Sequence, residues 1–87
     1  MNFPFEQEIF EDKIVRTFHP DVDEEELKWH QDLKDRFVNV IEDGGWQFQM
    51  DNDLPIKLSE NKKFNIPKNT WHRVIKGTGI LIVEIKE

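Results

Sequence analysis

The chain has no cysteine and no tyrosine, and basic residues are scarce: 12 lysines and arginines stand against 18 acidic residues. Without cysteine, disulfides, thiolate metal ligands and cysteine nucleophiles are excluded. The formal net charge of −6 argues against a nucleic-acid-binding surface, because phosphate contacts need lysine and arginine gathered on one face. We therefore expect no nucleic-acid partner.

Long apolar runs are missing as well. No stretch approaches the roughly 18 apolar residues that span a membrane, and residues 1–6 lack the basic region and apolar run of a signal peptide. We expect a cytoplasmic protein that does not associate with membranes. With 87 residues, the chain is predicted to form one domain, residues 1–87, whose modest core a second chain could help to stabilise.

The chain does contain a series of short alternating apolar segments separated by turn residues. We predict strands, from their β-branched and aromatic content, over residues 13–18, 27–30, 36–42, 46–50, 54–58, 64–66, 71–74 and 80–85. Turn signals at intervals of roughly 8–12 residues predict an all-β fold, a small antiparallel β-barrel or sandwich.

The N-terminal residues 1–12 are predicted to form an extended arm or an edge strand. Phe3 and Phe5 alternate around Pro4, and proline is tolerated in a sheet only at such an edge. Large apolar side chains in a terminal arm need a surface to cover, which is either the chain's own barrel or a second subunit.

The residues with chemical potential lie near two of the predicted strands. His30 and Asp32 are two positions apart, so on an extended segment both side chains point the same way. His72 follows a turn in which Pro67 fixes φ and Asn69 tolerates the left-handed region. If the three meet, two imidazoles and one carboxylate form a facial triad for Fe(II), Mn(II), Ni(II) or Zn(II), with open positions left for substrate.

The same residues have simpler interpretations. His72 would be a core histidine that is hydrogen-bonded to Thr70 or to a backbone carbonyl. His30 and Asp32 would be an imidazole–carboxylate pair at the edge of the barrel. The spacing of the three residues does not distinguish these interpretations from a metal site.

Residues 24–87 resemble a small cupin domain. The second cupin motif reads Gly, five residues, Pro-x-Gly, two residues, His, three residues, Asn. Pro67 and His72 match it outright, and Asn61 and Asn69 stand at the glycine positions, where asparagine is next best at positive φ. Lys76 replaces the final Asn.

The first cupin motif is followed more loosely. It reads Gly, five residues, His-x-His, three or four residues, Glu, six residues, Gly. The corresponding positions here are Glu24, His30, Asp32, Arg36 and a glycine near Gly44. Glu24 and Arg36 depart from the pattern.

The resemblance implies a jelly-roll β-barrel with one metal ion inside it. Carried over, the ligands would be His30, Asp32 and His72. Arg36 puts a cation where an anionic ligand belongs, so it would pair with Asp32 or hold an acidic substrate.

Cupin interiors also tolerate polar side chains around a ligand, so we expect Gln47 and Gln49 to line the pocket rather than face solvent. The implied function is a metal-dependent enzyme or binding protein for a small polar or anionic molecule. The alternative is a metal-free ligand-binding or structural protein.

The resemblance extends to uncharacterised cupin-like proteins of tailed phages, through Trp-His-x-Asp at residues 29–32 and Gly-Trp-Gln-Phe-Gln at residues 45–49. It would then place the chain in the host cytoplasm.

Small cupins often pair, so we also expect a homodimer. Alternation sends Trp29 and Trp71 to the face opposite the two histidines. We predict that they, with Phe3 and Phe5, lie at or near the dimer interface. The alternative is that the N-terminal arm of the same chain covers the tryptophans.

Overall fold

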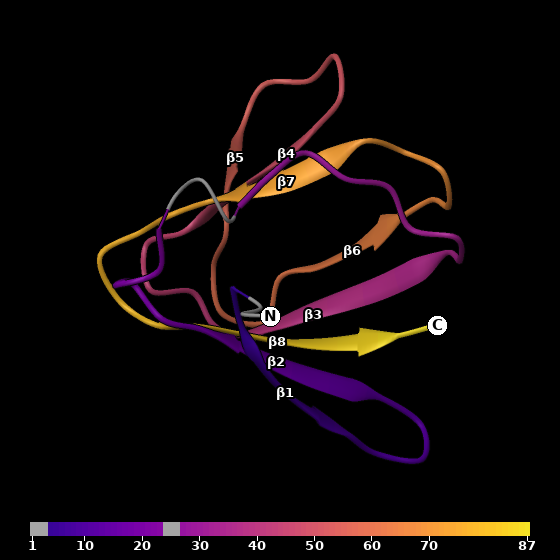
Figure 1. Cartoon of the computed structure of the whole chain (residues 1–87), viewed down its shortest axis with the longest axis horizontal. Coiled ribbons are helices and arrows are strands. Elements are labelled where there is room, and N and C mark those ends of the chain that lie inside the picture. The colour runs from indigo at the N-terminus through magenta and orange to yellow at the C-terminus, as the bar shows by residue number, and fades with distance from the viewer. Residues whose placement is uncertain (1–3, 24–26) are drawn as a thin grey trace.

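A computed structural model describes residues 4–23 and 27–87, and eight β-strands occur within these ranges (Figure 1). The strands are β1 (Glu6–Ile9), β2 (Ile14–Phe18), β3 (Arg36–Glu42), β4 (Gln47–Met50), β5 (Ile56–Lys57), β6 (Lys63–Ile66), β7 (His72–Ile75) and β8 (Leu81–Lys86). Within the described ranges, no helix has the length and apolar character needed to cross a bilayer.

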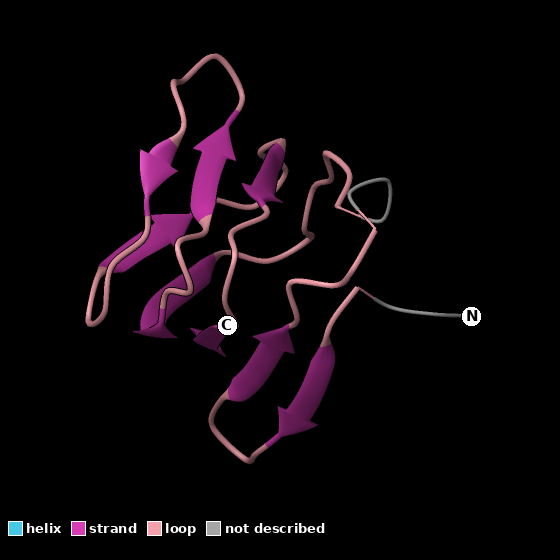
Figure 2. Ribbon diagram, turned by 90° about the vertical axis from the view of Figure 1, so that its left-hand side faces the viewer, coloured by secondary structure: helices cyan, strands magenta, loops and turns pink. Residues whose placement is uncertain are grey.

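The strands form two antiparallel sheets. The larger sheet has the order β1-β2-β8-β3-β6, and the smaller has the order β5-β4-β7. Neighbouring strands often come from distant parts of the chain, since β8 pairs with both β2 and β3. Figure 2 shows the β1–β2 hairpin at the lower edge of the molecule. The predicted all-β antiparallel fold is confirmed.

Alternation along the strands supplies a core between the two sheets. On β8, Leu81, Val83 and Ile85 are buried, whereas the intervening Ile82 and Glu84 are only partly so. The other buried apolar side chains are Phe18, Val38, Val40, Trp46, Phe48, Leu58 and Ile66. Both sheets therefore contribute to one apolar core.

One end of this core is closed by Trp46, which is fully buried. Its Nε1 donates to the carbonyl oxygen of Gly79 at 2.7 Å, and the Gly79 amide donates to the carbonyl oxygen of Gly44 at 2.9 Å. A Cβ atom on Gly77 would lie 2.5 Å from that same Gly44 oxygen, so the two loops touch backbone to backbone. A side chain at Gly44 or Gly77 therefore has no room.

The observed strands lie where the predicted ones do to within a residue at most ends, with two larger differences. β5 covers only Ile56–Lys57, because Pro55 has no amide hydrogen to donate to a neighbouring strand. The segment expected before Asp32 is not a strand, and from it only His30 pairs, with His72, in an isolated bridge. β1, in the predicted N-terminal arm, is an edge strand that pairs with β2.

Candidate functional site

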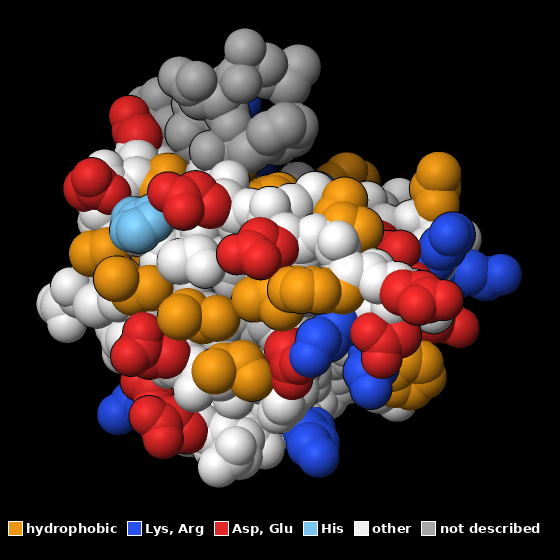
Figure 3. Space-filling view, turned by 90° about the horizontal axis from the view of Figure 1, so that it is seen from below, with side chains coloured by type: hydrophobic (Ala, Val, Ile, Leu, Met, Phe, Trp, Pro, Cys, Tyr) orange, Lys and Arg blue, Asp and Glu red, His pale blue; other side chains and the backbone are white. Residues whose placement is uncertain are grey.

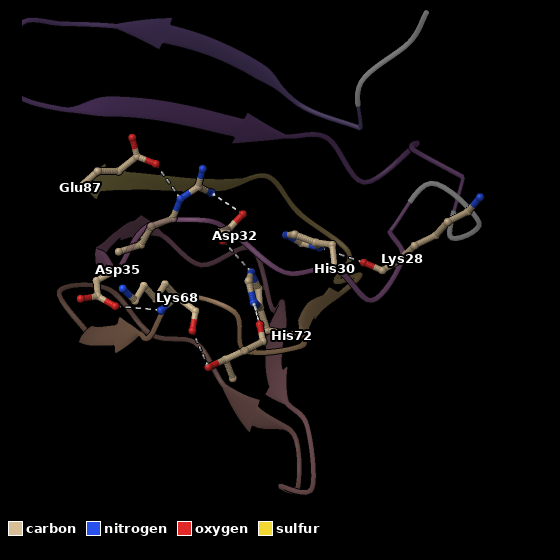
Figure 4. A network of polar contacts seen from close by, with 9 residues as sticks. Lys28, His30, Asp32, Asp35, Lys68, His72 and Glu87 are labelled. Atoms are coloured by element: carbon tan, nitrogen blue, oxygen red, sulfur yellow. Dashed lines mark hydrogen bonds and ion pairs between the residues drawn. The ribbon is translucent and has the colours of Figure 1, made fainter.

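The turn between β6 and β7 fixes the position of His72. Asn69 has a φ of +61°, and its amide donates to the carbonyl oxygen of Asp32 at 2.8 Å. The Lys68 amide donates to Asp35 Oδ1, also at 2.8 Å. These two bonds tie the turn to the loop that carries Asp32, so His72 and Asp32 lie side by side (Figure 4).

His30 is held opposite His72 by the backbone. The amide of each residue donates to the carbonyl oxygen of the other at 3.0 Å. Directly opposed residues of an antiparallel pair send their side chains to the same side. The two ring centroids accordingly lie 4.2 Å apart. His72 is buried, whereas His30 is exposed.

Asp32 completes the group. Its Oδ2 lies 3.2 Å from His72 Nε2. Potential ligand atoms of His30, Asp32 and His72, one from each residue, lie within 4.8 Å of one another. The three side chains expected from the sequence to meet are therefore together.

The ring nitrogens of the two histidines have distinct roles. His30 Nδ1 lies 3.0 Å from the carbonyl oxygen of Lys28, and His72 Nδ1 lies 2.8 Å from that of Thr70. A carbonyl oxygen can only accept, so each Nδ1 carries a proton and donates it. In the neutral ring each Nε2 is then unprotonated, which is the form that binds a metal ion.

The surroundings of His72 favour its neutral form. Burial lowers the pKa of His72 below its usual value, and the nearby His30 and Arg36 lower it further. The Thr70 carbonyl and the Asp32 carboxylate oppose this shift without cancelling it. The neutral Nε2 therefore faces a carboxylate oxygen, and two acceptors are in contact without a proton between them.

A divalent cation fits this arrangement. Asp32 Oδ2 is buried and accepts no hydrogen bond from any residue in the described ranges, one of two side-chain oxygens in that state. It lies within ion-pair distance of His72 Nε2, but the two atoms are not aligned as a hydrogen bond. A buried carboxylate oxygen without a partner is costly. Two imidazole nitrogens and one carboxylate oxygen suit Fe(II), Mn(II), Ni(II) and Zn(II).

Arg36 occupies the other side of the same carboxylate. Its Nη1 lies 3.4 Å from Asp32 Oδ1, and its Nε donates to Glu87 Oε2 at 3.0 Å. Arg36 thus forms the ion pair with Asp32 that was one of its two expected roles. The two oxygens of Asp32 serve different neighbours, and Oδ2 stays available.

The cluster lines a cavity of about 370 Å³ between the two sheets. Most of its wall is apolar and includes Phe48, Leu58 and Val74. This volume is at the small end of the range for ligand pockets, and an apolar wall with a few convergent polar groups is their usual composition.

Gln47 and Gln49, which we expected in the pocket, do not line this cavity. Gln49 Oε1 instead accepts hydrogen bonds from Arg73 Nε at 3.0 Å and from Arg73 Nη2 at 2.9 Å. The large apolar side chains of Trp46 and Phe48 take the inner face of this segment, so alternation turns the glutamines outward. The expected placement of the two glutamines in the pocket was wrong.

Trp29 and Trp71 are 38% and 47% exposed, respectively, on the outside of the molecule. The guanidinium carbon of Arg73 lies 4.9 Å from the Trp29 ring centroid and partly covers it. Other apolar side chains also reach the surface, and Figure 3 shows several side by side among acidic ones on the lower face. The homodimer stays a prediction.

Phe5 is partly buried against the core. Its ring packs against Phe18 with 5.3 Å between the ring centroids, and it lines the cavity. The N-terminal segment therefore covers the chain's own core at this point, which was the alternative to a dimer contact. Phe3 lies outside the described residues.

Arg16 also lines the cavity, and we had not assigned it a role from the sequence. On β2 it alternates with Ile14 and Phe18, which both pack in the core, and so it shares their inward face. That alternation was visible in the sequence and could have placed this arginine inside.

No protein-family model matches the chain, and no curated protein matches it in sequence. Solved structures do resemble it. A cupin-2 domain protein from Shewanella frigidimarina matches 100% of this chain and 83% of its own, with a TM-score of 0.68 and 19% identity. A cupin domain from Bordetella pertussis matches 99% of this chain and 96% of its own, with a TM-score of 0.64 and 18% identity.

A longer protein also shares the fold. The structure of Fe(II) HppE in complex with substrate matches 100% of this chain with a TM-score of 0.67 and 14% identity, and the chain covers 55% of it. At such identities these similarities establish the fold, and the predicted jelly-roll cupin fold is confirmed. They show no link to tailed-phage proteins.

Proposed function

We propose that this cupin-fold protein binds a divalent metal ion through His30 Nε2, His72 Nε2 and Asp32 Oδ2, and that the site holds a small polar or anionic molecule in the cavity. One observation carries the proposal. His72 Nε2 and Asp32 Oδ2, both acceptors, lie 3.2 Å apart, and within the described residues no hydrogen-bond donor satisfies the buried oxygen. A cation between acceptors removes that cost.

The surrounding residues support the proposal. The carbonyl oxygens of Lys28 and Thr70 hold the imidazoles by their Nδ1 protons, which is how metal-binding histidines are commonly oriented. Arg36 holds the carboxylate of Asp32 by its other oxygen. HppE, which shares the fold, has Fe(II) and substrate in its structure.

Three protein ligands would leave coordination positions open for another molecule. A bound ion would supply a localised positive charge that polarises an oxygen atom of that molecule. The chain's own apolar residues, among them Phe48 and Val74, surround the same space and would pack against the apolar part of that molecule.

A metal-free ligand-binding protein is the second candidate function. The ion pair between Arg36 and Asp32 favours it, because this pair already neutralises part of the carboxylate charge. In this case His72 would be a buried structural histidine. The two candidates differ in whether the protein retains a divalent ion through its histidines.

Elemental analysis of protein purified without a histidine tag or chelator separates the two candidates. We expect about one divalent ion per chain, retained or taken up on incubation with Fe(II), Mn(II), Ni(II) or Zn(II). His72→Ala and Asp32→Ala should lose it. His19→Ala is the matched control, because His19 bonds to Glu6 outside the cluster, and this variant should keep the ion. If the parent protein contains no metal after each of these incubations, the proposal is refuted.

A further inference from the structure

Arg16 is an inward-facing cation in the wall of the cavity that contains the His30, Asp32 and His72 cluster. Its neighbours on the same face of β2, Ile14 and Phe18, pack in the core. Arginine is rarely buried without a charged partner. The groups around Arg16 therefore indicate which kind of ligand the cavity can bind.

The side chain of Arg16 is held in place by neutral groups. Its Nε donates to Gln7 Oε1 at 2.9 Å, and its guanidinium carbon lies 4.2 Å from the centroid of the Phe5 ring. Among the described residues no carboxylate forms an ion pair with it, and its two terminal Nη groups make no hydrogen bond. One edge of the guanidinium is fixed, and the fork of Nη groups is available.

The second arginine of the cavity differs from it in this respect. Arg36 is already paired with Asp32 at 3.4 Å and with Glu87 at 3.0 Å. Lys28 contributes to the cavity wall as well, but its carbonyl faces His30 and its ammonium group points away from the cluster (Figure 4). Of the two arginines, Arg16 is the one that the described residues leave without a carboxylate partner.

The charge balance points in the same direction. Arg16, Arg36, Asp32 and Glu87 together carry no net charge, so a divalent ion at the cluster would give this group of side chains two excess positive charges. Burial lowers the pKa of Arg16, and repulsion from Arg36 lowers it further, with only partial relief from the carboxylates. A bound anion would offset both effects, although the chain as a whole is acidic.

We propose that the Nη fork of Arg16 binds the carboxylate of a small organic acid whose other end lies at the His30–Asp32–His72 site. A guanidinium fork matches a carboxylate in a planar, bidentate way. The cavity wall is mostly apolar, with Phe48 and Val74 among its residues, and it suits a short aliphatic chain. This inference rests on the proposed function, because it takes the cluster as the site of the other end.

Arg73 provides a matched control for Arg16. It also donates from Nε to a glutamine on the neighbouring strand, Gln49, and it also stacks on an aromatic ring, that of Trp29. It does not line the cavity. Substituting either arginine changes the net charge equally and removes the same kinds of contact, but only one of them faces the cavity.

Isothermal titration calorimetry with malonate, succinate and glutarate, on Zn(II)-loaded and metal-free protein, tests the proposal. At least one of these acids should bind the parent, and Arg16→Gln should weaken that binding by about 10- to 100-fold. Arg73→Gln should leave it unchanged. Arg16→Lys keeps the charge but not the fork, so its affinity for the acid should lie between those of the parent and of Arg16→Gln. If Arg16→Gln does not fold, Arg16→Lys takes its place and is compared with Arg73→Lys.

The possible outcomes distinguish the two proposals. Arg16→Gln should retain the metal content of the parent, since Arg16 is not a ligand. If the parent holds no metal but acid binding still depends on Arg16, the proposed carboxylate site at Arg16 is supported and the proposed metal site is refuted. If no acid binds the parent, or if Arg16→Gln and Arg73→Gln bind it equally well, the proposed carboxylate site is refuted.

Discussion

The two ends of the molecule are built from the same sheets but differ in how their polar groups are satisfied. At one end, the loops around Gly44 and Gly79 touch backbone to backbone, and the indole of Trp46 donates its only polar hydrogen to a carbonyl oxygen. At the other end, His72 and Asp32 bring two acceptors within 3.2 Å, and the carboxylate oxygen is left without a donor among the described residues.

This difference separates what stabilises the fold from what the fold can bind. At the closed end, formed by Trp46, Gly44 and Gly79, the indole and the Gly79 amide have hydrogen-bond partners within the chain, so substitutions there should reduce stability. The polar end leaves a buried carboxylate oxygen without a donor among the described residues, so changing it should alter binding more than folding. Four predictions test this contrast, from the largest expected effect on stability to the smallest.

Removing the indole at the closed end should have the largest effect on stability. Trp46→Ala should lower the free energy of unfolding by about 3–5 kcal/mol, because it leaves a cavity where a fully buried ring packs. Urea denaturation measures this loss. The control is Trp71→Ala, whose exposed side chain should cost about 1 kcal/mol or less. Equal losses in the two variants would contradict the contrast.

Adding metal should stabilise the polar end. At 100 times its dissociation constant, Zn(II) should raise the free energy of unfolding of the parent by about 2.7 kcal/mol, since the site requires the folded chain. Denaturation with and without the ion measures the shift. His72→Ala should show none of it, whereas Trp71→Ala should show all of it. A shift of the same size in His72→Ala would mean that the ion binds elsewhere.

Removing Arg36 should have a smaller effect that depends on metal. Arg36→Met leaves the carboxylates of Asp32 and Glu87 without their shared partner, and should cost about 1–3 kcal/mol in metal-free protein. In Zn(II)-loaded protein the loss should be smaller, because the ion takes over part of the neutralisation. Paired unfolding curves measure the difference, and an equal loss in both states would show that Arg36 and the ion do not share Asp32.

The smallest effect should come from the outer face of the larger sheet. The Lys13 ammonium and the Asn39 amide donate to Glu84 and lower the pKa of its carboxyl below the usual value. The folded state therefore binds fewer protons than the unfolded state, and this contribution is present above pH of about 4.5 and is lost as the pH falls below it.

Glu84→Gln should remove this pH dependence, which is small because solvent screens the pair of Lys13 and Glu84. Unfolding followed between pH 7 and pH 3, with Glu8→Gln as the control on an exposed strand, measures it. Neither variant should change metal content. Identical pH profiles for Glu84→Gln and the parent would refute the role of this pair.

Much of the fold could be predicted from the sequence, because alternation and turn chemistry are local. Strand β3 begins and ends where its β-branched and aromatic residues predict. Asn61 and Asn69, at the glycine positions of the second cupin motif, have the positive φ angles of +66° and +61° expected there. The proximity of His30 and His72 followed from motif spacing and not from any local signal.

Other parts of the site could not be read in this way. Alternation divides a strand into two faces but does not show which face is inside. Here the large apolar side chains of Trp46 and Phe48 are buried, and Gln47 and Gln49 lie on the other face. The division of the Asp32 oxygens between Arg36 and His72 depends on segments that meet only in the folded chain. Contacts between distant segments determine these features.

The most direct test of the metal site is the ring ¹⁵N NMR spectrum of the three histidines during a Zn(II) titration. Before zinc is added, His30 and His72 should both carry their proton on Nδ1, as their bonds to carbonyl oxygens require. Zinc should then shift the Nε2 signals of both rings and leave His19 unchanged. Protonated Nε2 atoms at the start, or no selective shift of His30 and His72, would contradict the account.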